Sequence, residues 1–246
     1  SRALGVPSVV FVDAADTPGI ESAMKTYVRY LGALFRVVTN GSAGVVVLEG
    51  LEDLALPHIR HDRVTTIPNG AVIPPEVARP NQNGAALELL SIGRLVLRKG
   101  FQDILAALGE VRRERSDFRL RIVGYGRAED EIKRVLDRYQ IAQNVEFVGR
   151  VEYSALGAEY LRSDAYLFYG DREGSSLAMI EAAAYGLPVI ASDHPGNRTY
   201  VEHGKSGFLV APKTPEKLAE AVLQLLRSRD PLSAVRHAGQ ALAPHR

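Results

Sequence analysis

The chain reads LELLSIGRLVLRKGFQDILAAL at residues 87–108, and this stretch determines the fold class that we predict. Its first part, 87–92, is a short apolar run that ends at Gly93, as a buried strand does. After a basic loop, apolar residues return at helical spacing, at Phe101, Ile104, Leu105 and Leu108. A strand, a loop that begins and ends with glycine, and an amphipathic helix form one repeat of an α/β protein.

The same alternation continues toward the C-terminus. We predict strands at 120–123, 145–148, 165–169 and 189–191, and helices at 129–139, 156–161, 177–185 and from Thr214 onward. Gly186 and Pro188 end the third of these helices, and Pro215 is placed as the first residue of the last one. Short strands that alternate with helices indicate a parallel sheet with helices on both faces, the doubly wound, Rossmann-like arrangement.

The first seventy residues repeat the pattern on a smaller scale. Predicted strands lie at 9–12, 45–48 and 64–67, with a helix-like segment at 20–35. Three strands are too few for a complete doubly wound domain, and a stretch rich in proline and asparagine follows them. We therefore predict a truncated Rossmann-like domain at 1–72, a linker at 73–85 and a complete domain at 86–246.

The composition excludes several classes of protein. The chain has 246 residues and no cysteine, which excludes a disulfide framework, a thiol nucleophile and a zinc site built from cysteine. Thirty basic residues against 29 acidic ones give a net charge of +1, so that a nucleic-acid partner is not indicated. The six histidines lack the spacing of a metal site, and we expect no metal. Apolar stretches fall short of the roughly 20 residues of a membrane span, so we expect a cytoplasmic protein.

The basic loop after the first quoted strand is a candidate anion site. In an open parallel sheet, ligands bind beyond the carboxyl ends of the strands. Gly93 and Gly100 allow the backbone to approach a ligand, and Arg94 and Lys99 are placed to hold one anion from two sides. Together the two cations could neutralise a departing diphosphate without a metal. The alternative is a solvated basic loop.

The most informative stretch is EGSSLAMIE, residues 173–181. Ser175 or Ser176 is the natural N-cap of the helix that follows, so backbone N–H groups and the helix dipole would face an anion at this end. Glu181 falls on an apolar face of that helix, where a carboxylate is costly unless it has partners. The two vicinal hydroxyls of a ribose would suit Glu181, and sugar hydroxyls would suit Glu173. The alternative is that Glu173 only interacts with the helix dipole and that an arginine or a backbone group holds Glu181.

The turn Gly124-Tyr125-Gly126 matches the start of a dinucleotide fingerprint, Gly-x-Gly-x-x-Gly, but Glu129 occupies the last place. Glu146 stands about twenty residues on, as a ribose-binding acid would, yet in the middle of a predicted strand. An NAD-binding oxidoreductase is therefore a weak alternative. A glycine turn that lets the backbone approach a ligand is the simpler interpretation.

Further motifs follow one another in a fixed order along the chain. They are IPNG at 67–70, GRL at 93–95 with KG at 99–100, IVGYG at 122–126, GRV at 149–151, AYGLPVIAS at 184–192 and GKSGFLV at 204–210. With Glu173, seven residues and Glu181, this set resembles the retaining, nucleotide-sugar-dependent glycosyltransferases of family 4, which have the GT-B fold. The resemblance covers most of the chain, and the order of the motifs makes it specific.

The resemblance implies a role for each matching residue. Arg94 and Lys99 would hold the donor diphosphate, Glu173 the hydroxyls of the transferred sugar and Glu181 those of the ribose. The base would lie against the backbone near Arg150 and Val151. The donor site would be completed at Gly93, Gly124, Gly174, Ser175, Ser176 and Leu177.

The resemblance also implies the reaction and the partners. The family transfers a hexose from a nucleotide sugar with retention and without a required metal or other cofactor. UDP is the nucleotide we expect from its frequency in the family, with GDP and ADP open. The acceptor is unknown (a sugar, a lipid-linked molecule or a small molecule), and no nucleic acid is expected. A lipid-linked acceptor would bring the full-length protein into peripheral contact with a membrane.

The family's first domain is a full Rossmann-like half that carries the acceptor contacts, and this chain begins inside that half. We therefore expect a fragment that holds the donor site and binds the donor without turnover. Two further alternatives are a non-catalytic nucleotide-sugar-binding module and an epimerase of the GT-B type, which would require acid and base residues in the first half.

Overall fold

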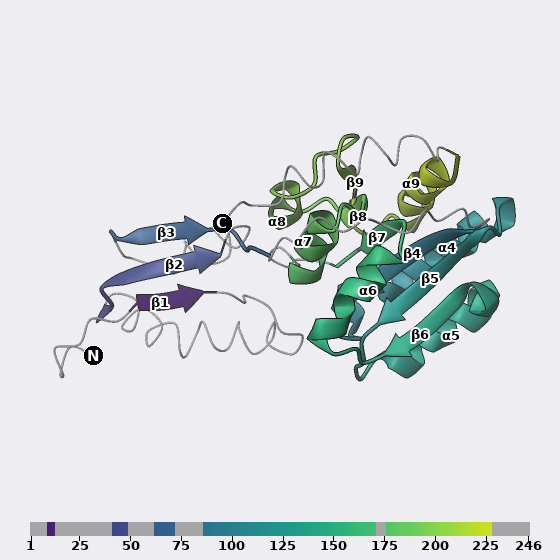
Figure 1. Ribbon diagram of the computed structural model, residues 1–246, viewed down its shortest axis with the longest axis horizontal. Coiled ribbons are helices and arrows are strands. Elements are labelled where there is room, and N and C mark those ends of the chain that lie inside the picture. Colours follow the sequence, from purple (N-terminus) through teal and green to yellow (C-terminus); the bar gives the residue numbers. More distant parts are fainter. Residues whose placement is uncertain (1–8, 13–40, 49–61, 72–85, 171–175, 228–246) are drawn as a thin grey trace. The chain divides into compact units, whose positions relative to one another are not determined.

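The structure is a computed structural model of the chain (Figure 1). It describes residues 9–12, 41–48, 62–71, 86–170 and 176–227. The chain divides into two compact units, the first containing residues up to Asn69 and the second most of the residues from Gly70 onward. The predicted helix at 20–35 and the predicted linker at 73–85 lie outside the described residues.

The first unit contains a parallel sheet of three short strands, in the order β1 (Val9–Val12), β2 (Gly44–Leu48) and β3 (Val64–Ile67). Val10 is paired with Val45 and Val47 with Thr66, so that β2 is the central strand. The side chains of Val45 and Val47 are buried. All three strands predicted for this region are confirmed, and β2 begins one residue earlier than expected.

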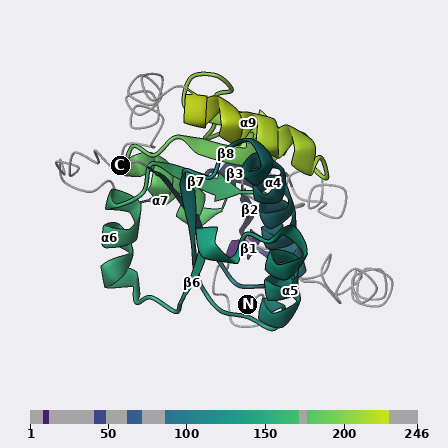
Figure 2. The ribbon, with the colours of Figure 1, turned by 90° about the vertical axis from the view of Figure 1, so that its right-hand side faces the viewer.

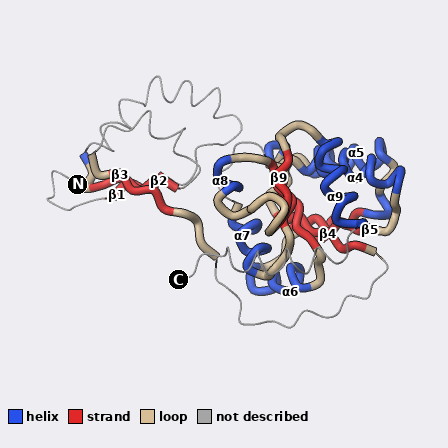
Figure 3. Tube along the Cα trace, turned by 90° about the horizontal axis from the view of Figure 1, so that it is seen from above, coloured by secondary structure: helices blue, strands red, loops and turns tan. Residues whose placement is uncertain are grey.

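The second unit is built on a sheet of six strands. They are β4 (Leu87–Ile92), β5 (Phe118–Val123), β6 (Val145–Gly149), β7 (Ala165–Phe168), β8 (Val189–Ser192) and β9 (Gly207–Val210). Their order is β6-β5-β4-β7-β8-β9, and all the paired strands are parallel. Figure 3 shows the strands of this sheet in red and the helices around them in blue. The chain steps outward from β4 in one direction and from β7 in the other, which is the doubly wound Rossmann order. The predicted α/β fold with parallel sheets is confirmed.

Helices cover both faces of this sheet (Figure 2). One face carries α4 (Phe101–Glu114), α5 (Glu129–Tyr139) and α9 (Pro215–Arg227), and the other carries α6 (Leu156–Leu161) and α7 (Leu177–Ala184). Neighbouring residues of a strand pack into different hydrophobic cores, because successive side chains point to opposite faces of the sheet. Leu89 packs with the residues of α4, whereas Leu90 packs with Met179 and Ile180 of α7.

The sequence pattern does not predict two short elements of this unit. They are β9 and the single-turn helix α8 (Pro195–Arg198). The helix α8 begins with Pro195 and Gly196 and the strand β9 begins with Gly207, and these residue types indicate turns in a sequence. Gly207 begins β9 for a steric reason, since a Cβ at this position would lie 1.9 Å from the carbonyl oxygen of Val189.

The first test concerns Gly100, which ends the loop after β4 and is the N-cap of α4. Its φ is 72°, and a Cβ there would lie 2.0 Å from the carbonyl oxygen of Tyr169. The variant Gly100→Ala combines a left-handed backbone with a collision against another segment of backbone. We expect its free energy of unfolding, measured by urea denaturation, to fall by about 3 kcal/mol or more.

Gly204→Ala is the matched control for this variant. Gly204 has a similar φ of 81°, but no atom lies within 4 Å of the position of the added Cβ. We expect this variant to lose only about 1–2 kcal/mol, the cost of the left-handed conformation alone. Equal losses in the two variants would contradict the steric constraint at Tyr169.

Candidate functional site

The strand order of the second unit changes direction between β4 and β7. The connections from these two strands run to opposite faces of the sheet, and doubly wound proteins bind their ligands beyond the carboxyl ends at this point. The loop after β4 is Gly93–Gly100, and β7 leads directly to the segment that precedes α7. The basic loop and the start of α7, which the sequence singles out separately, therefore belong to one edge of the sheet.

The basic loop packs on the end of β7. Gly100 lies against the backbone of Tyr169, as described above, and the buried side chain of Leu95 anchors the middle of the loop. The carbon chain of Lys99 runs beside Gly93, and its ammonium lies 5.5 Å from the centre of the Phe168 ring. The structure therefore holds the charge of Lys99 at the edge where β4 and β7 end.

The glycine turn after β5 is bound to the same loop. A Cβ at Gly124 would lie 1.9 Å from the carbonyl oxygen of Gly93, and one at Gly126 would lie 2.4 Å from that of Leu95. The amide of Leu95 also donates a hydrogen bond of 3.0 Å to the carbonyl of Tyr125. The close approach that these glycines permit is thus made to the neighbouring loop. It fixes the backbone that precedes and follows Arg94, whose side chain is exposed.

Glu181 is buried on α7, with two tyrosine hydroxyls as its partners. The residue is 7% exposed. The hydroxyl of Tyr153 donates to its Oε1 at 2.9 Å, and the hydroxyl of Tyr160 donates to its Oε2 at 2.7 Å. A buried carboxylate requires such donors, because it is costly to remove it from water without them. The partners are tyrosines rather than the arginine or backbone group of the alternative interpretation, and ribose binding stays a prediction.

The two tyrosines lie in different environments. Tyr160 of α6 is buried, and its ring stacks on Tyr185 with 5.0 Å between the centroids. Burial raises the pKa of Tyr160 far above its ordinary value, so the hydroxyl keeps its proton and remains a donor. Tyr153 begins the 3₁₀ helix η5 (Tyr153–Ala155) and is 67% exposed. The hydrogen bond to Glu181 is the main cause that raises the pKa of Tyr153.

Sequence reasoning does not find these tyrosines. Tyr153 and Tyr160 lie 28 and 21 residues before Glu181, on other elements. Their proximity depends on how α6 packs beside α7, which no local spacing shows. The buried carboxylate itself is the useful signal, since it requires donors from somewhere in the fold.

The residues that the resemblance assigns to the base directly precede η5. Arg150 and Val151 follow the carboxyl end of β6. The guanidinium of Arg150 lies 6.0 Å from the centre of the exposed Tyr125 ring. Val151 is half-buried and packs on the core that includes α7. The chain therefore brings the expected base-side residues within a few positions of Tyr153, a partner of Glu181.

The start of α7 includes the remaining predicted contacts. Ser176 is the N-cap of this helix and is buried, although its side chain makes no capping hydrogen bond. Leu177 is the first helical residue, and nearly half of its surface is exposed. Glu173, Gly174 and Ser175 lie outside the described residues, and their roles stay predictions.

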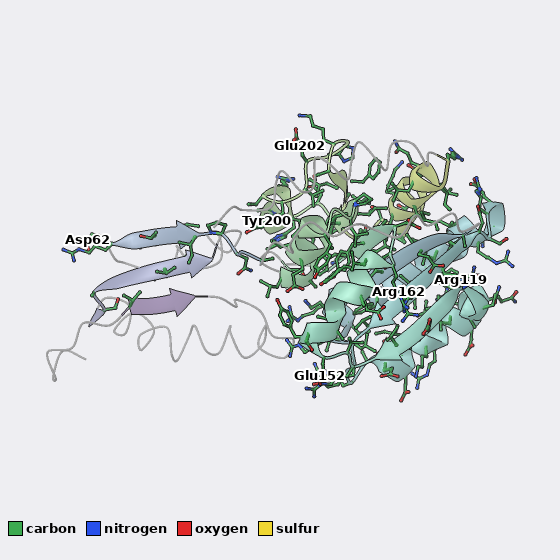
Figure 4. All side chains as sticks on the ribbon, in the orientation of Figure 1. Asp62, Arg119, Glu152, Arg162, Tyr200 and Glu202 are labelled. Atoms are coloured by element: carbon green, nitrogen blue, oxygen red, sulfur yellow. The ribbon has the colours of Figure 1, made fainter. Side chains whose placement is uncertain are left out.

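Glu146, the acid that a dinucleotide fingerprint would use, forms an ion pair with a residue of the neighbouring strand. It lies in the interior of β6 and pairs with Arg121 of β5. Arg121 also donates to Glu159 of α6 at 2.9 Å, and Arg162, labelled in Figure 4, lies 3.6 Å from Glu159. The sequence contains a signal for this cluster, because Arg121 stands between the apolar Leu120 and Ile122 of β5 and so lies on the opposite face of the sheet from them. The oxidoreductase alternative gains no support from Glu146.

Among the residues that the structure describes, no three or more histidine, aspartate or glutamate side chains form a group that could hold a metal ion. A helix long and apolar enough to cross a bilayer is also absent from the described segments.

The variant Tyr160→Phe tests the support of Glu181. It removes one of the two hydroxyls that donate to a buried carboxylate and leaves the aromatic ring in place. We expect the free energy of unfolding to fall by about 2 kcal/mol, the cost of leaving a buried acceptor without its donor. Urea denaturation followed by circular dichroism measures this loss.

Tyr139→Phe is the control, since it removes a hydroxyl from a half-buried ring of α5 that packs on the other core. We expect this variant to stay within about 0.5 kcal/mol of the wild type. A loss in Tyr160→Phe no larger than in Tyr139→Phe would show that the hydroxyl of Tyr160 does not support Glu181.

Comparison with known families and proteins gives a consistent result. The model of the family described as Glycosyl transferases group 1 matches residues 73–241. Glycogen synthase of Mycobacterium tuberculosis is 35% identical over 180 residues, which cover 72% of this chain and 43% of that protein. A GDP-mannose-dependent alpha-(1-6)-phosphatidylinositol monomannoside mannosyltransferase of the same species is 30% identical over 172 residues, which cover 67% of this chain and 45% of that protein. The chain thus spans less than half the length of these relatives.

Solved structures show the same fold. The crystal structure of Anabaena Alr3699/HepE in complex with UDP and glucose matches 99% of this chain and 68% of its own, with a TM-score of 0.82 and 20% identity. The pneumococcal O-GlcNAc transferase GtfA, in complex with UDP and GlcNAc, matches 89% of this chain and 44% of its own, with a TM-score of 0.73 and 23% identity. The likeness at this identity concerns the fold, which is that of GT-B glycosyltransferase structures.

Proposed function

The chain belongs to the glycosyl transferases group 1 family, and we propose that it carries the donor site of a retaining glycosyltransferase of family 4. The reaction moves a sugar from a nucleoside-diphosphate sugar, in first place a UDP-sugar, to a hydroxyl of an acceptor. The observation that carries the proposal is the placement of loop 93–100 and of α7 at the same edge of the sheet, beyond β4 and β7. Relatives named for GDP-mannose and structures that contain UDP support a nucleotide sugar and leave both bases open.

Loop 93–100 is suited to the diphosphate leaving group. When the bond between the anomeric carbon and the phosphate oxygen breaks, negative charge grows on the diphosphate. Arg94 offers a planar fork of donors and Lys99 a compact charge, and both would stabilise the leaving group. The positive end of the α7 dipole would add to this effect. The chain thus offers the electrostatic stabilisation that a metal would otherwise supply, and we propose that no metal or other cofactor is required.

The carboxylates would orient the donor. Glu181 would accept hydrogen bonds from the ribose, and Glu173 would accept them from the transferred sugar. The two donors of Glu181 are neutral hydroxyls, so its carboxylate remains an acceptor for hydroxyls of the same kind on a ribose. Backbone groups at Arg150 and Val151 would bind the base. We propose that the acceptor attacks on the face from which the diphosphate leaves, which gives retention without a covalent intermediate on the enzyme.

In the whole protein, we propose two domains and an acceptor that binds on the side of the first one. Residues 1–72 would form the end of the acceptor-side domain, joined by a linker at 73–85 to the donor domain at 86–246. The acceptor would be a sugar, a lipid-linked molecule or a small molecule, met in the cytoplasm or at a membrane surface. The name of one relative, a phosphatidylinositol monomannoside mannosyltransferase, supports a lipid-linked acceptor.

Isothermal titration with UDP, GDP and NAD tests the class of donor. We expect UDP or GDP to bind at least 10-fold more tightly than NAD, because the site would hold one diphosphate and one ribose. Binding of NAD in the absence of UDP and GDP binding would contradict the proposal and favour the oxidoreductase alternative. Binding of a nucleotide sugar by the complete protein, without transfer to any acceptor, would favour a non-catalytic module instead.

The variant Lys99→Ala tests the role of the basic loop. We expect the Kd for UDP to rise about 10-fold or more, since a charged contact to the diphosphate is lost. In the complete protein the turnover would fall by roughly 10²-fold, as for the loss of one preorganised donor in other enzymes.

Lys133→Ala is the matched control for Lys99→Ala. The ammonium of Lys133 also lies over a phenylalanine ring, at 5.2 Å from the centre of Phe147, but on the surface of α5. We expect no change in nucleotide affinity. Equal effects of the two variants would assign the loss to general charge and would remove the diphosphate role from Lys99.

A further inference from the structure

We propose that, in the absence of a nucleotide, the hydroxyl of Tyr153 takes the place of a ribose hydroxyl on Glu181, and that a bound nucleotide displaces it. This inference rests on the proposed function, because it assumes that Glu181 binds a ribose. It makes Tyr153 a residue that tunes the affinity for nucleotides with a ribose diol. The proposal depends on the geometry of Glu181 and its two tyrosines.

The two oxygens of Glu181 have partners that differ in their exposure to solvent. Oε2 accepts from Tyr160, which is buried between the rings of Tyr166 and Tyr185, with centroid distances of 6.4 and 5.0 Å. Oε1 accepts from Tyr153, which is 67% exposed. A ligand that arrives from solvent therefore meets the carboxylate on the side of Tyr153.

Tyr153 is also the partner that can leave at little cost. It lies on η5, which has three residues, none of them buried, and no side-chain cap. Rotation of an exposed ring opens no cavity in the core, whereas movement of Tyr160 would empty a packed position. The side chain of Tyr153 can therefore move while the backbone and both cores stay in place.

The exchange conserves the type of hydrogen bond. The hydroxyl of Tyr153 keeps its proton at neutral pH, since the ordinary pKa of tyrosine is about 10 and the hydrogen bond to Glu181 raises this pKa further. A ribose hydroxyl is a donor of the same kind, and it would meet the same acceptor atom, Oε1. One O–H group replaces another on a carboxylate, so this exchange alone changes the free energy little. The contacts of the phosphates with the protein would make displacement of Tyr153 by the nucleotide favourable.

Nucleotide titrations of the variant Tyr153→Phe test the inference. The phenylalanine keeps the ring but has no hydroxyl to compete for Oε1, so the Kd for UDP or GDP, whichever binds the wild type, should fall by about 5-fold, the scale of one net hydrogen bond. The Kd for the 2′,3′-dideoxy form of the same nucleotide should not change, because this analogue has no diol to exchange with Tyr153. The control Tyr139→Phe should leave both affinities unchanged.

The possible outcomes separate this inference from the proposed function. If the folded wild-type chain binds neither UDP nor GDP, the proposed function fails and the inference fails with it. If the wild type binds a nucleotide and Tyr153→Phe binds it equally well or more weakly, only the inference fails. An equal gain for the dideoxy analogue would also contradict it, since the gain would then be unrelated to the diol.

Fluorine NMR gives an independent measurement of the displacement. The chain has ten tyrosines, so incorporation of 3-fluorotyrosine gives a small set of fluorine resonances. The resonance that is missing in Tyr153→Phe identifies Tyr153. We expect this resonance to move toward the position of a solvent-exposed tyrosine when UDP or GDP saturates the protein. A resonance that stays at its ligand-free position in the saturated protein would overturn the inference.

Discussion

The absence of a side chain at three glycines allows the loops beyond the sheet of the second unit to approach one another closely. A Cβ at Gly100, Gly124 or Gly126 would come within 2.4 Å of a backbone oxygen of a neighbouring segment. The loops after β4, β5 and β7 therefore touch through their backbones, which are the least deformable part of the chain. The charge of Lys99 is positioned by this contact rather than by a flexible side chain alone. An anion site gains from such preorganisation, because its charges need not be rearranged when the ligand's charge grows.

The second unit holds its buried acids in two physically different ways. Glu159 is paired with Arg121, so that its charge is neutralised inside the structure. Glu181 has neutral hydroxyls as donors, from Tyr153 and Tyr160, and these stabilise its charge without cancelling it. A carboxylate of the second kind remains a strong acceptor for further hydroxyl groups, whereas one of the first kind is already satisfied by a cation. This difference, and not burial alone, marks Glu181 as the acid suited to a polyhydroxyl ligand.

Sequence periodicity was sufficient for most of the elements and insufficient for the contacts between them. The apolar run at 87–92 and the helical spacing after Gly100 predicted β4 and α4 directly, because each is long enough to show its period. The elements β9 and α8 instead begin with glycine and with proline and glycine, residue types that indicate a turn, and only the neighbouring strand explains why Gly207 begins β9.

At the candidate site, too, the sequence did not predict which elements contact each other. The glycines of the turn after β5 and the partners of Glu181 are two examples. The sequence showed that Gly124 permits a close approach, but the residue in contact is Gly93 of the neighbouring loop. The sequence likewise showed that Glu181 requires partners, but Tyr153 and Tyr160 reach it only through the packing of α6 beside α7. The residue type thus indicates that a close contact or a hydrogen-bond donor is needed, and the tertiary structure determines which neighbour provides it.

The strand order of the second unit is shared with dinucleotide-binding proteins, so the fold alone does not choose between a dinucleotide and a nucleotide sugar. The choice depends on the loops. The turn after β5 has Glu129 in the last glycine position of the fingerprint, and the acid that follows it, Glu146, is paired with Arg121. The loop after β4 instead carries Arg94 and Lys99 at the edge of the sheet where α7 begins. The loops therefore give a dinucleotide fingerprint no support, whereas the nucleotide-sugar donor that we propose requires neither the missing glycine nor Glu146.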